Sequence, residues 1–155
     1  MDKTLDVTSF TLNGSDVSVA PAPGERLSHS LRERLDARDV KVGCNAGDCG
    51  ACTVLVDGAP VCACLMPTAQ AQGTVVETQA GLVERDDIAQ RLADSFHAHQ
   101  AAQCGICTPG MMTAAVALLR DTRSPDHAQV EDALGGVLCR CTGYRKIIDA
   151  VVAAG

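Results

Sequence analysis

Aromatic residues are almost absent from this chain of 155 residues: it has no tryptophan, and Phe10, Phe96 and Tyr144 are its whole aromatic supply. Any core must therefore be built from small and aliphatic side chains, mainly Ala, Val and Leu. If the chain forms two small domains, each of these cores stabilises its domain only marginally. Domains below about 80 residues are commonly stabilised by bound metal as well. We therefore expect metal binding and folding to be linked.

Basic clusters and long apolar runs are also missing. The formal net charge is −6 and no run of Lys or Arg occurs, which argues against a nucleic-acid partner. No stretch approaches the roughly 18 uninterrupted apolar residues of a membrane-spanning helix, so we expect no membrane insertion. Residues 1–6 have neither the apolar core of a signal peptide nor a twin-arginine pair. These observations predict a cytoplasmic protein.

Cysteine, by contrast, is abundant, with nine residues. A disulfide framework is the first alternative, but it requires an oxidising compartment and is least strained with an even number of cysteines. An odd count without an export signal favours metal ligation.

The first group of cysteines lies in a glycine-rich loop, residues 43–52, with the spacing C-x4-C-x2-C that opens the plant-type pattern for a 2Fe–2S cluster. We assign to this group Cys44, Cys49, Cys52 and Cys64. Glycines in the loop supply positive φ angles and let the chain approach inorganic sulfide closely. Zinc is the competing metal, but zinc knuckles usually space their ligands two to four residues apart within each pair. Cys62 and Cys64 have the same strand parity, so local geometry does not decide which is the ligand.

The second group combines C-x2-C with a distant C-x-C and comprises Cys104, Cys107, Cys139 and Cys141. The first pair precedes a helix start at Thr108-Pro109, where the helix dipole favours thiolates. The second pair follows a predicted helix, and two antiparallel helices would bring both pairs to one end of a bundle. Taken alone this group also suits zinc. A thioredoxin-like redox site is disfavoured because no βαβ pattern surrounds it.

The first half of the chain alternates in the manner of strands. Residues 3–20, including Leu5, read as a hairpin with Asn13-Gly14 at its turn. The stripe Leu27, Leu31 and Leu35 predicts a helix. Further strands are predicted at residues 53–56, 61–64 and 74–77. Strands mixed with one helix indicate the α+β class.

In the second half the hydrophobic period becomes helical, which predicts four helices in a compact bundle. Their stripes lie within residues 88–96, 111–119, 130–138 and 147–152. Thr108-Pro109 and Ser124-Pro125 each place an N-cap residue before a proline at the first helical position. With the boundary within residues 78–85, we predict a ferredoxin-like 2Fe–2S domain at 1–80 and a helical 2Fe–2S-binding domain at 81–155.

All four histidines read as ordinary surface residues. His97 and His99 fall on a predicted helix without a cysteine nearby, and a Rieske-type site needs two histidines at positions that are cysteines here.

Three segments, taken together, resemble a known family. Residues 43–54, 103–111 and 139–144 are similar, in this order, to the cluster motifs of the small iron–sulfur subunit of molybdenum hydroxylases. That group includes xanthine dehydrogenase, aldehyde oxidoreductase and aerobic carbon monoxide dehydrogenase. The resemblance covers nearly the whole chain. It implies a β-grasp, plant-ferredoxin-like domain followed by a four-helix bundle.

The resemblance also implies roles for individual residues. In such proteins the fourth ligand of the first cluster follows the third by twelve positions, which gives Cys64 and leaves Cys62 as an extra thiol. The glutamine before the first helical-cluster ligand and the last cysteine of C-x-C contact a pterin, which implies this role for Gln103 and Cys141.

The implied function is electron transfer within a molybdenum-dependent hydroxylase. A large partner subunit would hold the molybdopterin, and FAD on a medium subunit, or a haem protein, would accept the electrons. The chain has no catalytic residues of its own in this interpretation, because it lacks a nucleotide-binding G-x-G-x-x-G and the length for a flavin or molybdenum domain. A free-standing two-cluster ferredoxin and a zinc-binding interaction module are the alternatives.

Overall fold

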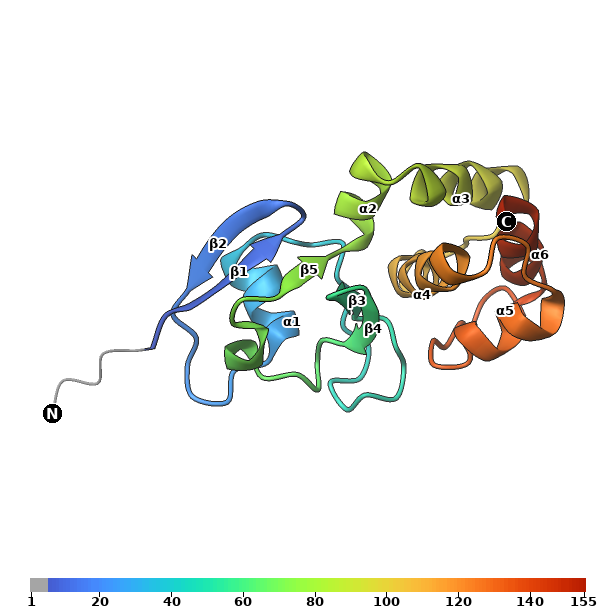
Figure 1. The fold of residues 1–155 in the computed structure, drawn as a ribbon. Helices are drawn as coiled ribbons and strands as arrows, with labels where there is room; N and C mark the ends of the chain where they lie inside the picture. The colour runs from blue at the N-terminus through green and yellow to red at the C-terminus, as the bar shows by residue number, and fades with distance from the viewer. Residues whose placement is uncertain (1–5) are drawn as a thin grey trace, which may run out of the picture.

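The structure is a computed structural model that describes residues 6–155, so the predicted strand residue Leu5 lies outside the described part. A sheet occupies one end of the molecule and a group of helices the other (Figure 1). The predicted α+β organisation, with strands in the first half and helices in the second, is confirmed.

Within residues 6–155, five strands form one mixed sheet in the order β2-β1-β5-β3-β4. Their bounds are β1 Thr8–Leu12, β2 Ser15–Val19, β3 Thr53–Val56, β4 Ala59–Cys62 and β5 Val75–Glu77. The central pair β1 and β5 is parallel, and the other neighbours are antiparallel.

Two tight turns set the strand positions. Asn13 and Gly14, with φ of 49° and 78°, form the predicted turn between β1 and β2. Asp57 and Gly58, with φ of 49° and 82°, form an equally short turn after β3. Strand β4 therefore begins directly after this turn, at Ala59, and ends at Cys62. The observed strand thus lies two residues earlier in the chain than the predicted strand at 61–64.

The predicted helix at Leu27–Leu35 covers the sheet, but in a different form. It begins as one α-turn, α1 Leu27–His29, and continues as a π-helical turn, η1 Ser30–Arg34. The Leu35 N–H donates to the carbonyl of Ser30, five residues back, at 3.1 Å. Leu27 and Leu31 are fully buried in the core of this half. A short 3-10 turn, η2 Thr68–Ala71, packs at β1.

The second half contains five helices rather than four: α2 Gln79–Arg85, α3 Asp87–Ala98, α4 Thr108–Asp121, α5 His127–Leu134 and α6 Arg145–Ala154. The four predicted helices correspond to α3–α6. The additional helix α2 occupies the region predicted as a domain boundary. It belongs to the helical half, because its Leu82 is buried in the helical core.

Two predicted helix starts need correction. Helix α5 is capped by Asp126, not Ser124: Asp126 and Gln129 form a reciprocal capping box, with hydrogen bonds of 2.8 and 2.9 Å. Helix α4 has Cys107 as its N-cap, so Thr108 is already its first residue. The end of α5 also comes early, at Leu134, because Gly135 and Gly136 follow.

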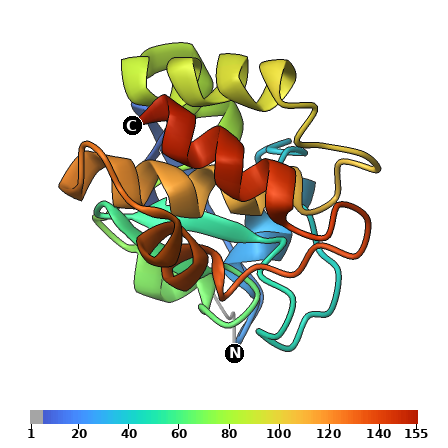
Figure 2. The same cartoon turned by 90° about the vertical axis from the view of Figure 1, so that its right-hand side faces the viewer.

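The helices of the second half pack into one group. Helix α3 contacts α4 and α6, and α5 contacts the same two helices, as the end-on view of Figure 2 shows. Each half buries one phenylalanine, Phe10 in the sheet core and Phe96 in the helical core. The two halves pack against each other at β3: Leu55 of this strand belongs to the helical core, and α4 packs on β3.

Within residues 6–155, no helix has the length and apolar character needed to cross a membrane.

Candidate iron–sulfur sites

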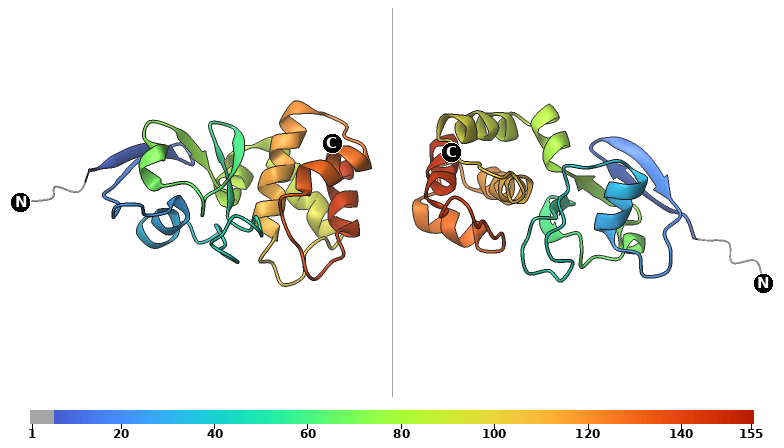
Figure 3. Two further views of the ribbon diagram at one scale, coloured as in Figure 1. Left: turned by 90° about the horizontal axis from the view of Figure 1, so that it is seen from below. Right: turned by 180° about the vertical axis from the view of Figure 1, so that it is seen from behind.

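The loop at residues 43–52 lies at the junction of the two halves, beside α4 and the chain that follows α5 (Figure 3). Its shape depends on left-handed residues: Asn45, Gly47 and Gly50 have φ of 57°, 80° and 67°. Gly43 has a different function, since a Cβ there would lie 3.0 Å from the sulfur of Cys49. The loop glycines thus meet two needs: positive φ angles, as predicted, and close approach to a cysteine thiol, which was not predicted.

The loop presents its first two thiols near the surface. The main-chain N–H groups of Ala46 and Cys49 donate to the Cys44 sulfur at 3.3 and 3.4 Å. These bonds lower the pKa of the Cys44 thiol to about 6, because they stabilise the thiolate. Cys44 and Cys49 are both half-buried.

The other two thiols of this group lie deeper. Cys52 and Cys64 are each 2% exposed, and the Cys64 N–H donates to the Cys52 sulfur at 3.4 Å. Burial raises the pKa of the Cys52 thiol to about 12. A thiol with so high a pKa becomes a thiolate only with a strong partner, which a bound metal provides.

Cys62 differs from Cys64 in its surroundings. It is the last residue of β4, opposite Thr53 of β3, and is half-buried. The prediction that Cys62 and Cys64 share a strand face is wrong, because β4 ends at Cys62 and the chain turns before Cys64. The turn places the buried Cys64 beside Cys52.

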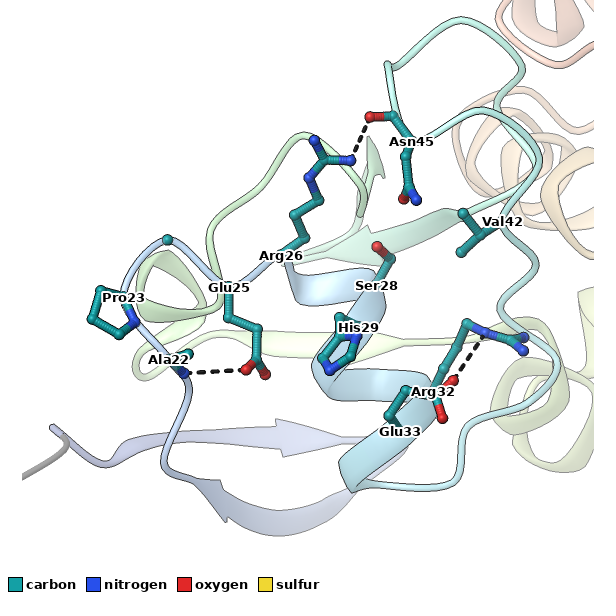
Figure 4. Close-up of a pocket in the computed structure, with 11 residues that line it drawn as sticks. Ala22, Pro23, Glu25, Arg26, Ser28, His29, Arg32, Glu33, Val42 and Asn45 are labelled. Atoms are coloured by element: carbon teal, nitrogen blue, oxygen red, sulfur yellow. Dashed lines mark hydrogen bonds and ion pairs between the residues drawn. The ribbon is translucent and has the colours of Figure 1, made fainter.

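Arg26 connects the loop to the start of α1 through a hydrogen bond. Its guanidinium donates to the main-chain oxygen of Asn45, across a surface cavity of about 550 Å³ shown in Figure 4. No cysteine lines this cavity. The cavity therefore borders the site rather than forming part of it.

The second group of cysteines comes together at the N-terminal end of α4. The sulfurs of Cys104 and Cys141 are 3.4 Å apart, and both residues are exposed. Cys107 and Cys139 are 7% and 9% exposed and lie beside each other. Each group thus consists of an outer pair and a buried pair.

The pKa values of the two thiols before α4 are shifted in opposite directions. The N–H of Ile106 lowers the pKa of Cys104, whereas burial and then the neighbouring Cys139 raise the pKa of Cys107 to about 12. Desolvation is therefore the largest influence on the pKa at the buried position.

Two hydroxyls that the sequence analysis did not single out hold the chain around Cys139. The Tyr144 hydroxyl accepts from the Cys139 N–H at 2.9 Å. The Thr142 hydroxyl lies 3.0 Å from the Cys139 sulfur and accepts from the Tyr144 N–H at 3.2 Å. Burial opposes ionisation of Cys139, but the bond with Thr142 lowers the pKa of this thiol. Tyr144 adopts a left-handed φ of 67°, which turns its ring back toward the site.

Gln103 lies beside the outer pair of the second group. Its side-chain amide donates to the main-chain oxygen of Cys141 at 3.2 Å, and both residues are exposed. Of the histidines, His29, His97 and His127 are exposed as expected, and His99 is half-buried against Ser95.

The arrangement in pairs fits a 2Fe–2S cluster, because each of its two irons needs two protein thiolates in addition to the bridging sulfides. Among residues 6–155, no three His, Cys, Asp or Glu side chains gather as they would around one metal ion. The Thr108 hydroxyl, next to Cys107, is buried and has no hydrogen-bond partner in the described part of the chain. Buried hydroxyls normally have a hydrogen-bond partner, so this one fits a site in which a sulfur of the bound cluster would accept its hydrogen bond.

Nearly the whole chain is similar to known iron–sulfur proteins. Residues 10–80 match the family described as 2Fe-2S iron-sulfur cluster binding domain, and residues 78–152 match the family described as 2Fe-2S binding domain. The chain is 43% identical to the nicotinate dehydrogenase small FeS subunit of Eubacterium barkeri, over 92% of this chain and 90% of that protein. It is 38% identical to the xanthine dehydrogenase iron-sulfur-binding subunit of Escherichia coli O157:H7, over 92% and 89%.

The fold is shared as well. In the crystal structure of quinoline 2-oxidoreductase from Pseudomonas putida 86, one chain superposes with a TM-score of 0.91 and 41% identity, over 97% of this chain and 92% of that one. The chain carries two 2Fe–2S binding domains and belongs to the family of small iron–sulfur subunits of molybdenum hydroxylases.

Proposed function

We propose that this chain relays electrons from a molybdopterin centre in a large partner subunit, through two 2Fe–2S clusters, to FAD on a medium subunit or to a haem protein. Each cluster, when bound, accepts and releases one electron. The observation that carries the proposal is the grouping of eight thiols into two sites, each with one buried and one outer pair.

The ligand assignment follows from this grouping. Residues 1–80 would hold the first cluster and residues 81–155 the second. The proposed ligands are Cys44, Cys49, Cys52 and Cys64 for the first cluster and Cys104, Cys107, Cys139 and Cys141 for the second. Cys62 is left out because Cys64 is buried against Cys52, whereas Cys62 ends a strand.

The partner's pterin is expected at the exposed edge of the second site. Gln103 and Cys141 are both exposed there and are joined by a hydrogen bond, so the amide of Gln103 is oriented by the chain itself. No catalytic role falls to this chain: its residues bind the two clusters, keep the buried thiols from water and orient the outer ones. We expect the complex to be cytoplasmic.

Metal analysis of the native complex tests the proposal. The tagged chain is purified from its natural host, and iron, molybdenum and zinc are measured together with bound flavin and haem. About four iron atoms per molybdenum are expected. Iron without molybdenum would indicate a free-standing ferredoxin, and zinc alone would disprove the redox function.

A further inference from the structure

The fourth proposed ligand of the first cluster, Cys64, does not belong to the loop that supplies the other three. It lies in residues 63–68, called here the Cys64 segment, which follows β4 and is bonded to the start of α1. Leu27 and Ser28 donate from their N–H groups to main-chain oxygens of this segment, at 2.8 and 3.0 Å. The position of this ligand therefore depends on α1 as well as on the loop.

A network of buried polar side chains reinforces this contact. Ser30 and Thr68 are both fully buried, and their hydroxyl oxygens lie 2.9 Å apart. The Thr68 N–H and hydroxyl both donate to the main-chain oxygen of Glu25, at 2.8 and 3.0 Å. The Ser30 hydroxyl donates to the Glu25 carboxylate at 2.6 Å. Because an unpaired buried hydroxyl is costly, these bonds favour a single position of the Cys64 segment.

The Glu25 carboxylate is itself held in place. Its side chain is 8% exposed and accepts from the Nε and Nη2 groups of Arg34, each at 2.7 Å. Ser30 and Arg34 are the first and last residues of the π-helical turn η1, so both ends of this turn donate to one carboxylate. The bonds from Arg34 and Ser30 lower the pKa of Glu25 to about 2, against the opposing effect of burial. The network therefore keeps its negative charge at neutral pH.

The start of α1 also contacts the loop. Arg26, which follows Glu25 in the chain, donates to the main-chain oxygen of Asn45, the residue after Cys44 (Figure 4). Residues 25–28 therefore bond both to the loop with the first three thiols and to the segment with the fourth.

We propose that Glu25, Ser30 and Thr68 are positioning residues for the first cluster, which fix the Cys64 thiolate relative to the three thiolates of the loop. Groups that surround metal ligands orient them and thereby strengthen metal binding. All three residues belong to the sheet half, so the second cluster should not depend on them. The inference rests on the proposed function, because it needs Cys64 to bind the first cluster.

Retention of each cluster by the intact complex tests the proposal. An iron chelator is added, and samples are reduced at intervals and measured by low-temperature electron paramagnetic resonance, which follows the two clusters separately. Thr68→Val removes the hydroxyl at nearly constant volume, so the first cluster should be lost about fivefold faster, as for one net hydrogen bond. Glu25→Gln leaves one oxygen for the donors of Arg34 and Ser30, and the acceleration should exceed about tenfold. The second cluster should be lost at the wild-type rate in both variants.

Two further variants separate positioning from general stability. Thr68→Ser keeps the hydroxyl and should restore the wild-type rate of cluster loss. Thr113→Val is the matched control: Thr113 of α4 is also fully buried, but its hydroxyl has no hydrogen-bond partner in the described part of the chain. Valine at this position should leave both rates unchanged. Equal acceleration for both clusters in Thr68→Val, or a serine variant as fast as the valine variant, would overturn the proposal.

The shape of the first-cluster resonance provides a second readout. A displaced Cys64 thiolate changes the symmetry around its iron, so the first-cluster signal of Glu25→Gln should differ from that of the wild type, while the second-cluster signal stays the same. A wild-type signal and a wild-type rate of loss in Glu25→Gln would show that the network does not position the ligand. Failure of the proposed function is distinguishable, because the first-cluster signal would then be missing from the wild type itself.

Discussion

The two cysteine sites have the same donors but are assembled differently. The first takes three of its four thiols from one loop, whose shape is set by left-handed residues such as Gly47 and Gly50. The second joins two segments that are distant in the sequence, and the packing of α4, α5 and α6 brings them together. The first site is therefore largely a local structure, whereas the second depends on the fold of its whole half.

Their surroundings differ in the same way. Main-chain N–H groups of the loop itself donate to the first-site thiol Cys44. In the second site a side-chain hydroxyl, from Thr142, bonds the sulfur of Cys139, and Tyr144 holds the Cys139 main chain. Side-chain substitutions should therefore tune the second cluster more readily than the first.

Removing one buried ligand from each site gives the largest expected effect. Cys52→Ser and Cys107→Ser should each lose one cluster, so that iron falls from about four atoms per chain to about two. Because the second site depends on helix packing, Cys107→Ser should also lower the thermal stability of the helical half. Iron analysis, visible absorption and thermal unfolding of the complex check these outcomes. Loss of all iron in either variant would show that the two sites are not independent.

Arg120 allows a test of how firmly the halves are joined. From α4, its guanidinium pairs with Glu77 at the end of β5 (3.0 Å) and with Asp86, the N-cap of α3 (2.6 Å). These pairs raise the pKa of Arg120, and the bonds from Arg120 help to hold the pKa of Asp86 below its ordinary value against the opposing effect of burial. Arg120→Met should lower the free energy of unfolding by about 1–3 kcal/mol, since two partly buried carboxylates lose their partner.

The control for Arg120 is the same substitution at an exposed arginine. Arg38 pairs with Asp36 and Glu33 at the surface, and 55% of its side chain is exposed. Arg38→Met should leave the free energy of unfolding nearly unchanged, because exposed ion pairs contribute little to stability. Equal losses in urea unfolding of the two variants would mean that Arg120 does not join the halves.

A smaller effect is expected when only the hydroxyl near Cys139 is removed. A ligand thiolate has no proton to give, and the Thr142 oxygen already accepts from Tyr144, so Thr142 donates to the sulfur. Such a bond favours the more negative, reduced cluster. Thr142→Val should lower the potential of the second cluster by about 40 mV, the equivalent of ~1 kcal/mol for one electron.

Thr142→Ser keeps the hydroxyl and should retain the wild-type potential. Redox titration followed by electron paramagnetic resonance resolves the two clusters. A shift of the first cluster, or an equal shift in the serine variant, would contradict the assignment.

The difference between the sites also explains how far the sequence alone could be interpreted. The cysteine spacing of the first loop, the Asn13-Gly14 turn and the four helical stripes are local signals, and the structure contains the corresponding features. The π-turn at Ser30–Arg34 and the helix α2 were not foreseen, because tertiary packing decides both. The roles of Thr142 and Tyr144 also escaped prediction, since their hydroxyls meet Cys139 only after the chain reverses at the left-handed Tyr144.

Cys62 provides the finest test, because it decides the fourth ligand of the first site. Sequence parity left Cys62 and Cys64 equivalent, but the short turn at Asp57-Gly58 ends β4 at Cys62 and carries Cys64 into the core beside Cys52. Cys62→Ala should therefore retain all iron and an unchanged absorption spectrum, with a loss of stability below about 1 kcal/mol. Cys64→Ala, the matched variant two residues away, should lose the first cluster. The reverse pattern would make Cys62 the ligand, and the first site would then require a local rearrangement of the chain after β4.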